Sequence, residues 1–250
     1  MNCSEYINGM MKIISVAKIL LIEQLREPTA LLWTIVSPSA LYIFMRTSKE
    51  TVSLSTQDYI ASSSWFYAYV ASSVAMFGLS FYLIGRRESG FVRSFIYQKR
   101  AIRIYLSAHF ATYSVVSLAH ASMFYLITRP LYGNYSVAEY LYLMACFYIA
   151  YSLFSAGALL VTLLPLKFTT ASTVFSILSF AFLVLGYLEA FYAETEMLER
   201  LVISPLTYCA AIFQGTIGLA SSFMYAAGAL GASLYVTCRN FRIQPVWSRY

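Results

Sequence analysis

Charged residues divide the chain into long apolar runs. Six stretches contain no Lys, Arg, Asp or Glu: residues 28–45, 59–85, 104–128, 140–166, 168–188 and 201–238. About 20 largely apolar residues are enough for a helix to cross the hydrocarbon core of a bilayer. A helix also satisfies its backbone amides internally, as the membrane requires. The runs lack the period-two alternation of barrel strands. The pattern therefore predicts an all-α membrane protein with a single domain over residues 1–250.

The runs predict six membrane-spanning helices. Their expected positions are residues 29–45, 60–84, 104–128, 138–164, 168–191 and 216–238. The last run, with 38 residues, is too long for one span and too short for two. Gly215 and Gly218 interrupt it. We therefore expect Pro205 to Gln214 to form a short external or re-entrant helix that packs against other spans.

Residues 1–27 have a different pattern, because charged residues are scattered through them. This excludes a signal peptide, which needs an uninterrupted apolar core. The apolar side chains of one helical face are Met10, Ile14, Ala17, Leu21 and Leu25. This spacing predicts an amphipathic elbow helix in the membrane interface. Arg26, Glu27 and Pro28 are expected to end it and begin the first span, since proline is well tolerated in a first helical turn.

The distribution of positive charge predicts the orientation in the membrane. The chain is 60% apolar and 11% charged, with a net charge of +6, whereas soluble domains have roughly 25% charged residues. All but four of the 17 Lys and Arg residues fall on one predicted side, in residues 1–27, 86–103, 167 and 239–250. Positive residues remain cytoplasmic. We therefore expect both termini on the cytoplasmic side of a bacterial inner membrane, and we expect no nucleic-acid partner.

Motifs for chemistry are absent from the sequence. It contains no G-x-x-x-x-G-K-[ST] phosphate loop, no H-E-x-x-H and no G-x-S-x-G, and its four cysteines are far apart. His109 and His120 are separated by 11 residues, about 16 Å along a helix, and cannot share a metal ion. We expect no catalytic residue, cofactor or metal site on this chain. His120 is expected to make an interhelical hydrogen bond, and an ion-coupled secondary transporter that uses it is an alternative. A membrane scaffold or sensor that transports nothing is a further alternative function.

The segment 86–103 has six positive residues and one acidic residue. The cytoplasmic position of this segment explains its positive charge but does not explain its apolar residues. Phe91, Val92, Phe95 and Ile96 can line one side of a short helix, and such apolar anchors favour docking into a groove on a partner.

Three local motifs, in this order along the chain, resemble those of the ABC-2 family of ABC-transporter permeases. Arg26-Glu27-Pro28 closes the elbow, with Pro38 in the first span. Arg87-Glu88-Ser89-Gly90, followed by Phe91-Val92-Arg93, is similar to the cytoplasmic R-E-x-G segment of the family, although Phe91 replaces a small hydroxyl residue. Ser204-Pro205-Leu206-Thr207-Tyr208 is similar to the element that precedes the last span. The similarity covers the whole chain.

This resemblance implies a permease subunit of an ATP-driven exporter. It would pair with a second permease copy or a paralogue and with two cytoplasmic ATPase subunits that bind ATP and Mg. Its other partners would be membrane lipid and a periplasmic or outer-membrane export component. The residues that the resemblance assigns to ATPase coupling are Arg87, Glu88, Gly90, Phe91, Val92, Arg93, Phe95 and Ile96, and those of the re-entrant element are Pro205, Leu206, Thr207 and Tyr208.

The implied cargo is amphipathic or lipid-like, such as a drug, lipid or peptide. The polysaccharide exporters of the family carry an L-G-x-x-W signature in the first span. This chain has Leu32-Trp33-Thr34-Ile35 there, without the glycine. Export of a polysaccharide or glycolipid is therefore the second expectation.

Overall fold

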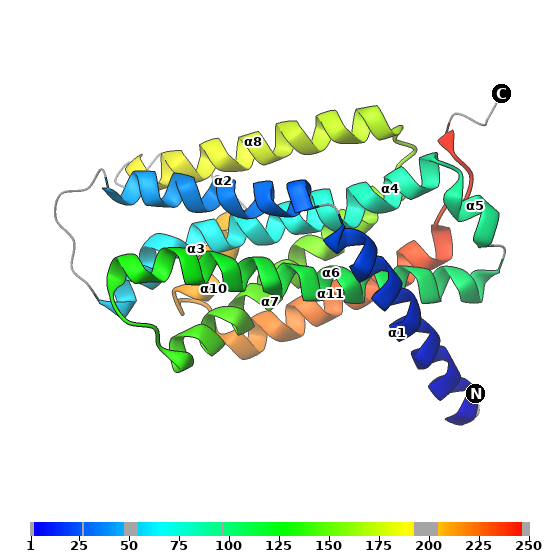
Figure 1. Cartoon of the computed structure of the whole chain (residues 1–250), viewed down its shortest axis with the longest axis horizontal. Coiled ribbons are helices and arrows are strands. Elements are labelled where there is room, and N and C mark those ends of the chain that lie inside the picture. Colours follow the sequence, from blue (N-terminus) through cyan, green and yellow to red (C-terminus); the bar gives the residue numbers. More distant parts are fainter. Residues whose placement is uncertain (1–2, 27, 48–54, 97, 193–204, 247–250) are drawn as a thin grey trace.

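The computed structural model describes residues 3–26, 28–47, 55–96, 98–192 and 205–246, and all regular secondary structure in these ranges is helical (Figure 1). The helices in chain order are α1 (Cys3–Leu25), α2 (Pro28–Thr47), α3 (Thr56–Ser73), the π-helix η1 (Val74–Ser80), α4 (Phe81–Glu88), α5 (Phe91–Phe95), α6 (Lys99–Thr128), the 3₁₀-helix η2 (Arg129–Tyr132), α7 (Val137–Val161), α8 (Phe168–Tyr192), α10 (Pro205–Phe213) and α11 (Leu219–Asn240).

Within these ranges, five helical segments are long and apolar enough to cross a membrane. They are Thr56–Glu88, Arg100–Tyr132, Val137–Val161, Phe168–Leu185 and Leu219–Asn240. They match five of the six predicted spans. Residues 29–45, the predicted first span, belong to the 20-residue helix α2, which runs alongside the bundle (Figure 1). Its crossing of the membrane stays a prediction.

One helical run is clearly longer than the span predicted for it. Helices α3, η1 and α4 form one continuous run of 33 residues from Thr56 to Glu88. At 1.5 Å per residue this is about 50 Å, whereas the hydrocarbon core is about 30 Å thick. The predicted span of 60–84 lies within this run, since a count of apolar residues stops where helices leave the hydrocarbon. The charged ends of these helices therefore project beyond the apolar region.

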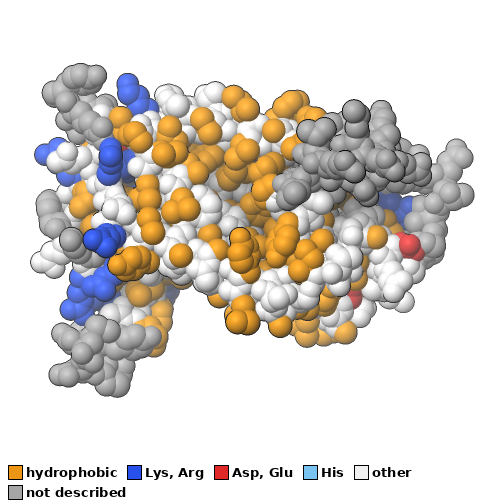
Figure 2. Space-filling model, turned by 180° about the vertical axis from the view of Figure 1, so that it is seen from behind, with side chains coloured by type: hydrophobic (Ala, Val, Ile, Leu, Met, Phe, Trp, Pro, Cys, Tyr) orange, Lys and Arg blue, Asp and Glu red, His pale blue; other side chains and the backbone are white. Residues whose placement is uncertain are grey.

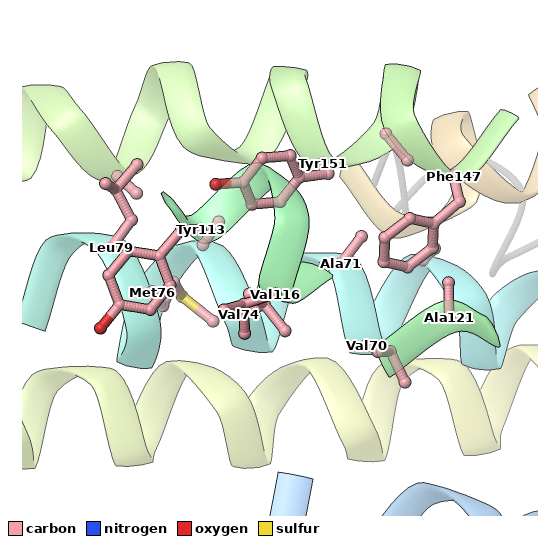
Figure 3. Packing of buried hydrophobic residues seen from close by; sticks show 14 of the residues in the cluster. Val70, Ala71, Val74, Met76, Leu79, Tyr113, Val116, Ala121, Phe147 and Tyr151 are labelled. Atoms are coloured by element: carbon pink, nitrogen blue, oxygen red, sulfur yellow. The ribbon is translucent and has the colours of Figure 1, made fainter. Parts of the chain in front are cut away.

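The core lies where α3, η1, α6 and α7 meet (Figure 3). Small side chains such as Ala71 and Ala121 allow close approach, and the larger Leu79 and Phe147 fill the remaining space. Close packing between η1 and α6 requires glycine at position 78. A Cβ atom at Gly78 would lie only 2.7 Å from the ring of Tyr113. The interior is thus a close-packed set of helices around η1.

Helices α8 and α11 cover the outside of this core and remain largely exposed. Large apolar side chains point away from the chain on both, among them Ile177, Phe180, Phe223 and Met224. Apolar side chains also cover the middle of the molecule in Figure 2. A belt of this kind is suited to contact with lipid tails rather than water.

Helix α1 crosses α6 obliquely, and its N-terminal end projects from the bundle (Figure 1). The Thr112 hydroxyl donates a hydrogen bond to the Ala17 carbonyl at 3.1 Å. Of the predicted apolar face, Leu21 packs against the core, whereas Met10, Ile14 and Leu25 are exposed. The helix is present at the predicted place, and its position in the membrane interface stays a prediction.

The last apolar run is divided between two helices. Helix α10 ends at Phe213, and α11 begins at Leu219, three residues after the predicted start of the last span. The Tyr142 hydroxyl of α7 donates a hydrogen bond to the Phe213 carbonyl at 3.0 Å. This bond satisfies a carbonyl that the end of α10 leaves without a helical partner. Helix α10 packs against α3, α7 and α8.

Candidate functional site

The segment between α4 and α6 lies at the end of the molecule where basic side chains gather, here called the basic end (Figure 2). The exposed basic side chains at this end include Arg93, Arg100, Arg103, Arg239 and Arg242. Helix α4 stops at Glu88, because Gly90 adopts φ 77°, in the left-handed region. This conformation is accessible to glycine without strain. It turns the chain so that the short helix α5 begins at Phe91.

Arg87 is the most buried charged side chain of this segment, with 1% of its surface exposed. Its guanidinium donates hydrogen bonds to three backbone carbonyls of the turn between α7 and α8: Thr162 at 2.8 Å, Leu164 at 3.2 Å and Leu166 at 2.7 Å. Carbonyls that follow a helix lack intrahelical partners. A cation is also favourable at the negative end of the helix dipole. Arg87 therefore fixes the end of α4 to the end of α7.

Glu88 connects the same point to the C-terminal segment. Its carboxylate accepts a hydrogen bond from Arg87 Nε at 3.0 Å, and it also accepts the backbone N–H of Val246, with N–O distances of 3.1 and 3.2 Å. The Arg87 charge keeps the buried carboxylate paired, as a group with 9% exposure requires. We call Arg87 and Glu88, together with the three carbonyls and the Val246 amide, the basic-end clamp.

Arg86 joins the segment to α1 and α5. It forms an ion pair with Glu23 of α1 and donates a hydrogen bond to the Tyr82 hydroxyl. Its guanidinium also lies 4.6 Å from the centroid of the Phe91 ring. A guanidinium over an aromatic face is held by the ring quadrupole. Arg86 thus connects the end of α4 to both α1 and α5.

The structure places the predicted coupling residues in different surroundings, and their role in ATPase coupling stays a prediction. Val92 and Ile96 are buried in the core, at 0% and 6% exposure, and Arg87 and Glu88 are enclosed in the clamp. Phe91 and Arg93 are exposed. The side chain of Phe95 lies outside the described residues. Phe91 and Val92 are adjacent in the sequence, yet one is exposed and the other is buried, so hydrophobicity alone could not separate them.

The other predicted site residues lie elsewhere. Arg26 follows α1 and is exposed, and Pro28 begins α2; Glu27 lies outside the described residues. Pro205, Leu206, Thr207 and Tyr208 form the first turn of α10, with Leu206 buried and Tyr208 exposed. Neither group contacts the basic-end clamp in the described contacts.

Sequence reasoning missed a buried ion pair at the opposite end of the bundle. Arg129 of η2 meets Glu139 of α7, with Nε–Oε1 and Nη2–Oε2 distances of 2.6 and 3.0 Å. Beside it the Tyr59 hydroxyl bonds those of Tyr67 and Thr128, each at 2.9 Å. The sequence does show two opposite charges, Arg129 and Glu139, on either side of a short predicted turn. The pattern does not reveal that they are buried.

The two histidines differ in their surroundings. His120 Nε2 is 2.7 Å from the Thr34 hydroxyl oxygen of α2, and its Nδ1 is 2.7 Å from the Val116 carbonyl oxygen. The predicted interhelical hydrogen bond of His120 is therefore present. His109 is fully buried among tyrosine rings, and within the described parts of the chain neither of its ring nitrogens has a hydrogen-bond partner. In the described ranges, no three His, Cys, Asp or Glu side chains gather in a way that could hold a metal ion.

Comparison with known proteins adds one relative. No family model matches the sequence, and no solved structure matches it. Protein McbE of Escherichia coli is 26% identical over 241 residues, which cover 94% of this chain and 98% of that protein. The similarity thus extends over nearly the full length of both proteins. The chain is a helical, multi-pass membrane protein. The name of the relative states no activity.

Proposed function

We propose that this chain is the permease subunit of an ATP-driven ABC exporter of the ABC-2 type. The observation that carries the proposal is the way α5 is presented. The short helix lies at the basic end, and its Phe91 and Arg93 are exposed, while the clamp fixes the end of α4, just before α5, to the α7–α8 turn and to the C-terminal segment. A force applied to α5 therefore reaches several spanning helices. This is the arrangement that an external ATPase needs in order to move the membrane helices.

The proposal assigns the chemistry to other chains. The sequence has no phosphate-binding loop, so ATP and Mg would be held by two partner ATPase subunits, and this chain would have no catalytic residue. A second permease copy or a paralogue would complete the transport path. The basic end would face the cytoplasm of a bacterial inner membrane, in line with its excess of arginine.

The proposed cargo is amphipathic or lipid-like. The interior of the described spans is almost uncharged. His120 lies within it and is hydrogen-bonded to Thr34. The buried ion pair of Arg129 and Glu139 lies at the ends of their helices, opposite the basic end. Movement of ions needs ionisable groups along the path. Packing of tyrosine, phenylalanine and small hydroxyl residues favours a cargo with apolar surface.

The test is a pull-down of the ATPase subunits with a tagged permease that carries Phe91→Asp. Burying a new carboxylate in an apolar socket is unfavourable. We expect loss of ATPase co-purification and of cargo export, while the amount of folded permease stays unchanged, because Phe91 is exposed in the isolated chain.

The matched control is Tyr135→Asp, which places the same acid on an exposed aromatic position at the opposite end. It should leave ATPase co-purification at the wild-type level. Phe91→Tyr, which keeps the aromatic ring, should do the same. If Phe91→Asp retains both export and the ATPase, α5 is not the coupling element. If no ATPase co-purifies even with the wild-type chain and export continues, the ABC assignment itself is wrong.

A further inference from the structure

A cavity of about 70 Å³ lies between α1, α2, η1 and α6, away from the basic-end clamp, and is open on one side. Its polar lining comes from Gln24, Thr34, Ser73, Tyr113 and His120, and three apolar side chains complete the wall. Ser73 and Val116 lie near the midpoints of the spans Thr56–Glu88 and Arg100–Tyr132. The cavity is therefore at the depth of the hydrocarbon, where polar side chains are costly unless they have a role.

The contacts of His120 involve both of its ring nitrogens. A carbonyl oxygen only accepts hydrogen bonds, so the nitrogen beside the Val116 carbonyl, Nδ1, carries a hydrogen. Nε2 is 2.7 Å from the Thr34 hydroxyl oxygen, which can donate or accept in this bond. Among the described residues no Lys, Arg, Asp or Glu lines the cavity, so these residues offer no counter-ion for a charged group.

Two polar groups of the wall retain hydrogen-bonding capacity. Serine in a helix commonly bonds back to a preceding carbonyl, as Ser72 does to Tyr69. The adjacent Ser73, with 7% exposure, makes no such bond within the described part of the chain. Gln24, which lines the cavity, accepts the Tyr113 hydroxyl at 2.9 Å through Oε1, and its amide N–H groups have no partner among the described residues. The wall thus supplies one hydroxyl and one N–H donor pair.

The π-helix η1 shapes this wall. Val74, Phe77 and Gly78 of η1 all line the cavity. The absence of a side chain at Gly78 lets the Tyr113 ring lie against the backbone, and this position allows the Tyr113 hydroxyl to reach Gln24. Single-turn π-segments are rare within helices and are frequent at functional sites. The irregular backbone and the polar groups therefore occur together.

We propose that this cavity binds the uncharged hydroxyl or amide group of a lipid-soluble amphipathic molecule, whose alkyl part stays in the bilayer. An apolar cavity of about 150 Å³ holds one benzene molecule, so this smaller cavity admits only a terminal group. Such a group both donates and accepts, and it matches Ser73 and Gln24. The site lies within one chain and needs no ATPase, so it stands or falls independently of the proposed exporter.

The test uses the full chain in phosphatidylcholine nanodiscs and 1-decanol with a diazirine in its alkyl chain as the probe. After irradiation, mass spectrometry locates the labelled peptides. We expect labelling around residues 24, 34, 73–78 and 113–120, and competition by excess decanamide. Decanoate and decyltrimethylammonium should not compete, because the cavity provides no opposite charge.

Ser73→Val removes the available hydroxyl and fills space, and Gln24→Leu removes the amide from a different helix. Each should lower the competed labelling about fivefold, the effect of one lost hydrogen bond. The matched control is Ser155→Val. Ser155 is also buried with an unpartnered hydroxyl, but it lies in α7 and does not line the cavity. Any of three outcomes would overturn the proposal: decanamide does not reduce the labelling, the charged probes compete equally well, or both cavity variants are labelled as fully as the parent chain.

Discussion

Arg87 shows how one side chain organises the basic end. Three backbone carbonyls of the α7–α8 turn and the Glu88 carboxylate surround its guanidinium. The planar group presents five donors in a fixed geometry, which an ammonium group cannot reproduce. Its charge is needed for the pairing with Glu88, and its shape is needed for the turn.

We expect Arg87→Met to lower the free energy of unfolding by about 3 kcal/mol or more, because Glu88 and the carbonyls lose their partner while remaining buried. Arg87→Lys should restore only a part. Thermal unfolding in detergent micelles measures both. Arg93→Met is the matched control: Arg93 is exposed on α5, and its replacement should change stability little. Equal effects at both positions would show that the clamp does not stabilise the fold.

Gly90 gives a second prediction at this scale. Because its φ is 77°, alanine there should destabilise the chain by about 1–2 kcal/mol, the penalty for a side chain in the left-handed region. Gly157 lies inside α7 with open space around the place of a Cβ atom, so Gly157→Ala should be neutral or slightly stabilising. The same unfolding measurement compares the two. A neutral Gly90→Ala would mean that the α4–α5 turn can relax.

At the scale of elements, the opposite end of the bundle is held by polar contacts between helices. The Arg129–Glu139 pair joins η2 to α7. The Ser62 hydroxyl of α3 connects to Tyr42 of α2 at 2.9 Å and to Tyr132 of η2 at 2.8 Å. With the basic-end clamp, these contacts fix both ends of the helices, while apolar packing fills the middle.

A double-mutant cycle tests the buried pair. Arg129→Leu or Glu139→Leu alone leaves a buried charge without its partner and should lower the free energy of unfolding by about 3–5 kcal/mol. The double variant should lose less than either single variant, since no unpaired charge remains. Denaturant titration in micelles gives the three values. Additive losses would show that the two side chains act independently.

Element positions were largely predictable, because membrane insertion imposes a simple rule on composition. Five predicted spans coincide with apolar helices. The helix ends were not predictable in the same way: α3, η1 and α4 continue to Glu88, beyond the predicted span end at residue 84. Charged residues can continue a helix once it has left the hydrocarbon, so hydropathy marks the edge of the membrane and not the end of the helix. The π-turn at Val74–Ser80 had no recognisable signal in the sequence.

For the whole molecule, the asymmetric charge predicts which end faces the cytoplasm. Single cysteines introduced by Ser94→Cys at the basic end and Tyr135→Cys at the opposite end report on this, since both positions are exposed. In intact cells a membrane-impermeant maleimide should label position 135 but not position 94, and lysis should expose both. The reverse pattern would place α5 outside the cell, out of reach of a cytoplasmic ATPase.

The parent chain serves as the background for that labelling. Among the described native cysteines, Cys146 and Cys209 are buried. Burial raises the pKa of the Cys209 thiol to about 12, so little thiolate is present at neutral pH and labelling there should be negligible. Subtracting the parent signal removes any contribution of Cys238, which is only half-buried.

The sequence by itself determined that this is a helical membrane protein and placed five of its long apolar helices, because these features follow from local composition. It also placed the basic end, since charge is visible along the chain. Only the tertiary structure decided which members of 86–96 face inward. Arg87 reaches carbonyls 75 to 79 residues away, and Glu88 reaches an amide 158 residues away. Burial depends on such distant partners, and periodicity over a few neighbouring residues contains no record of them.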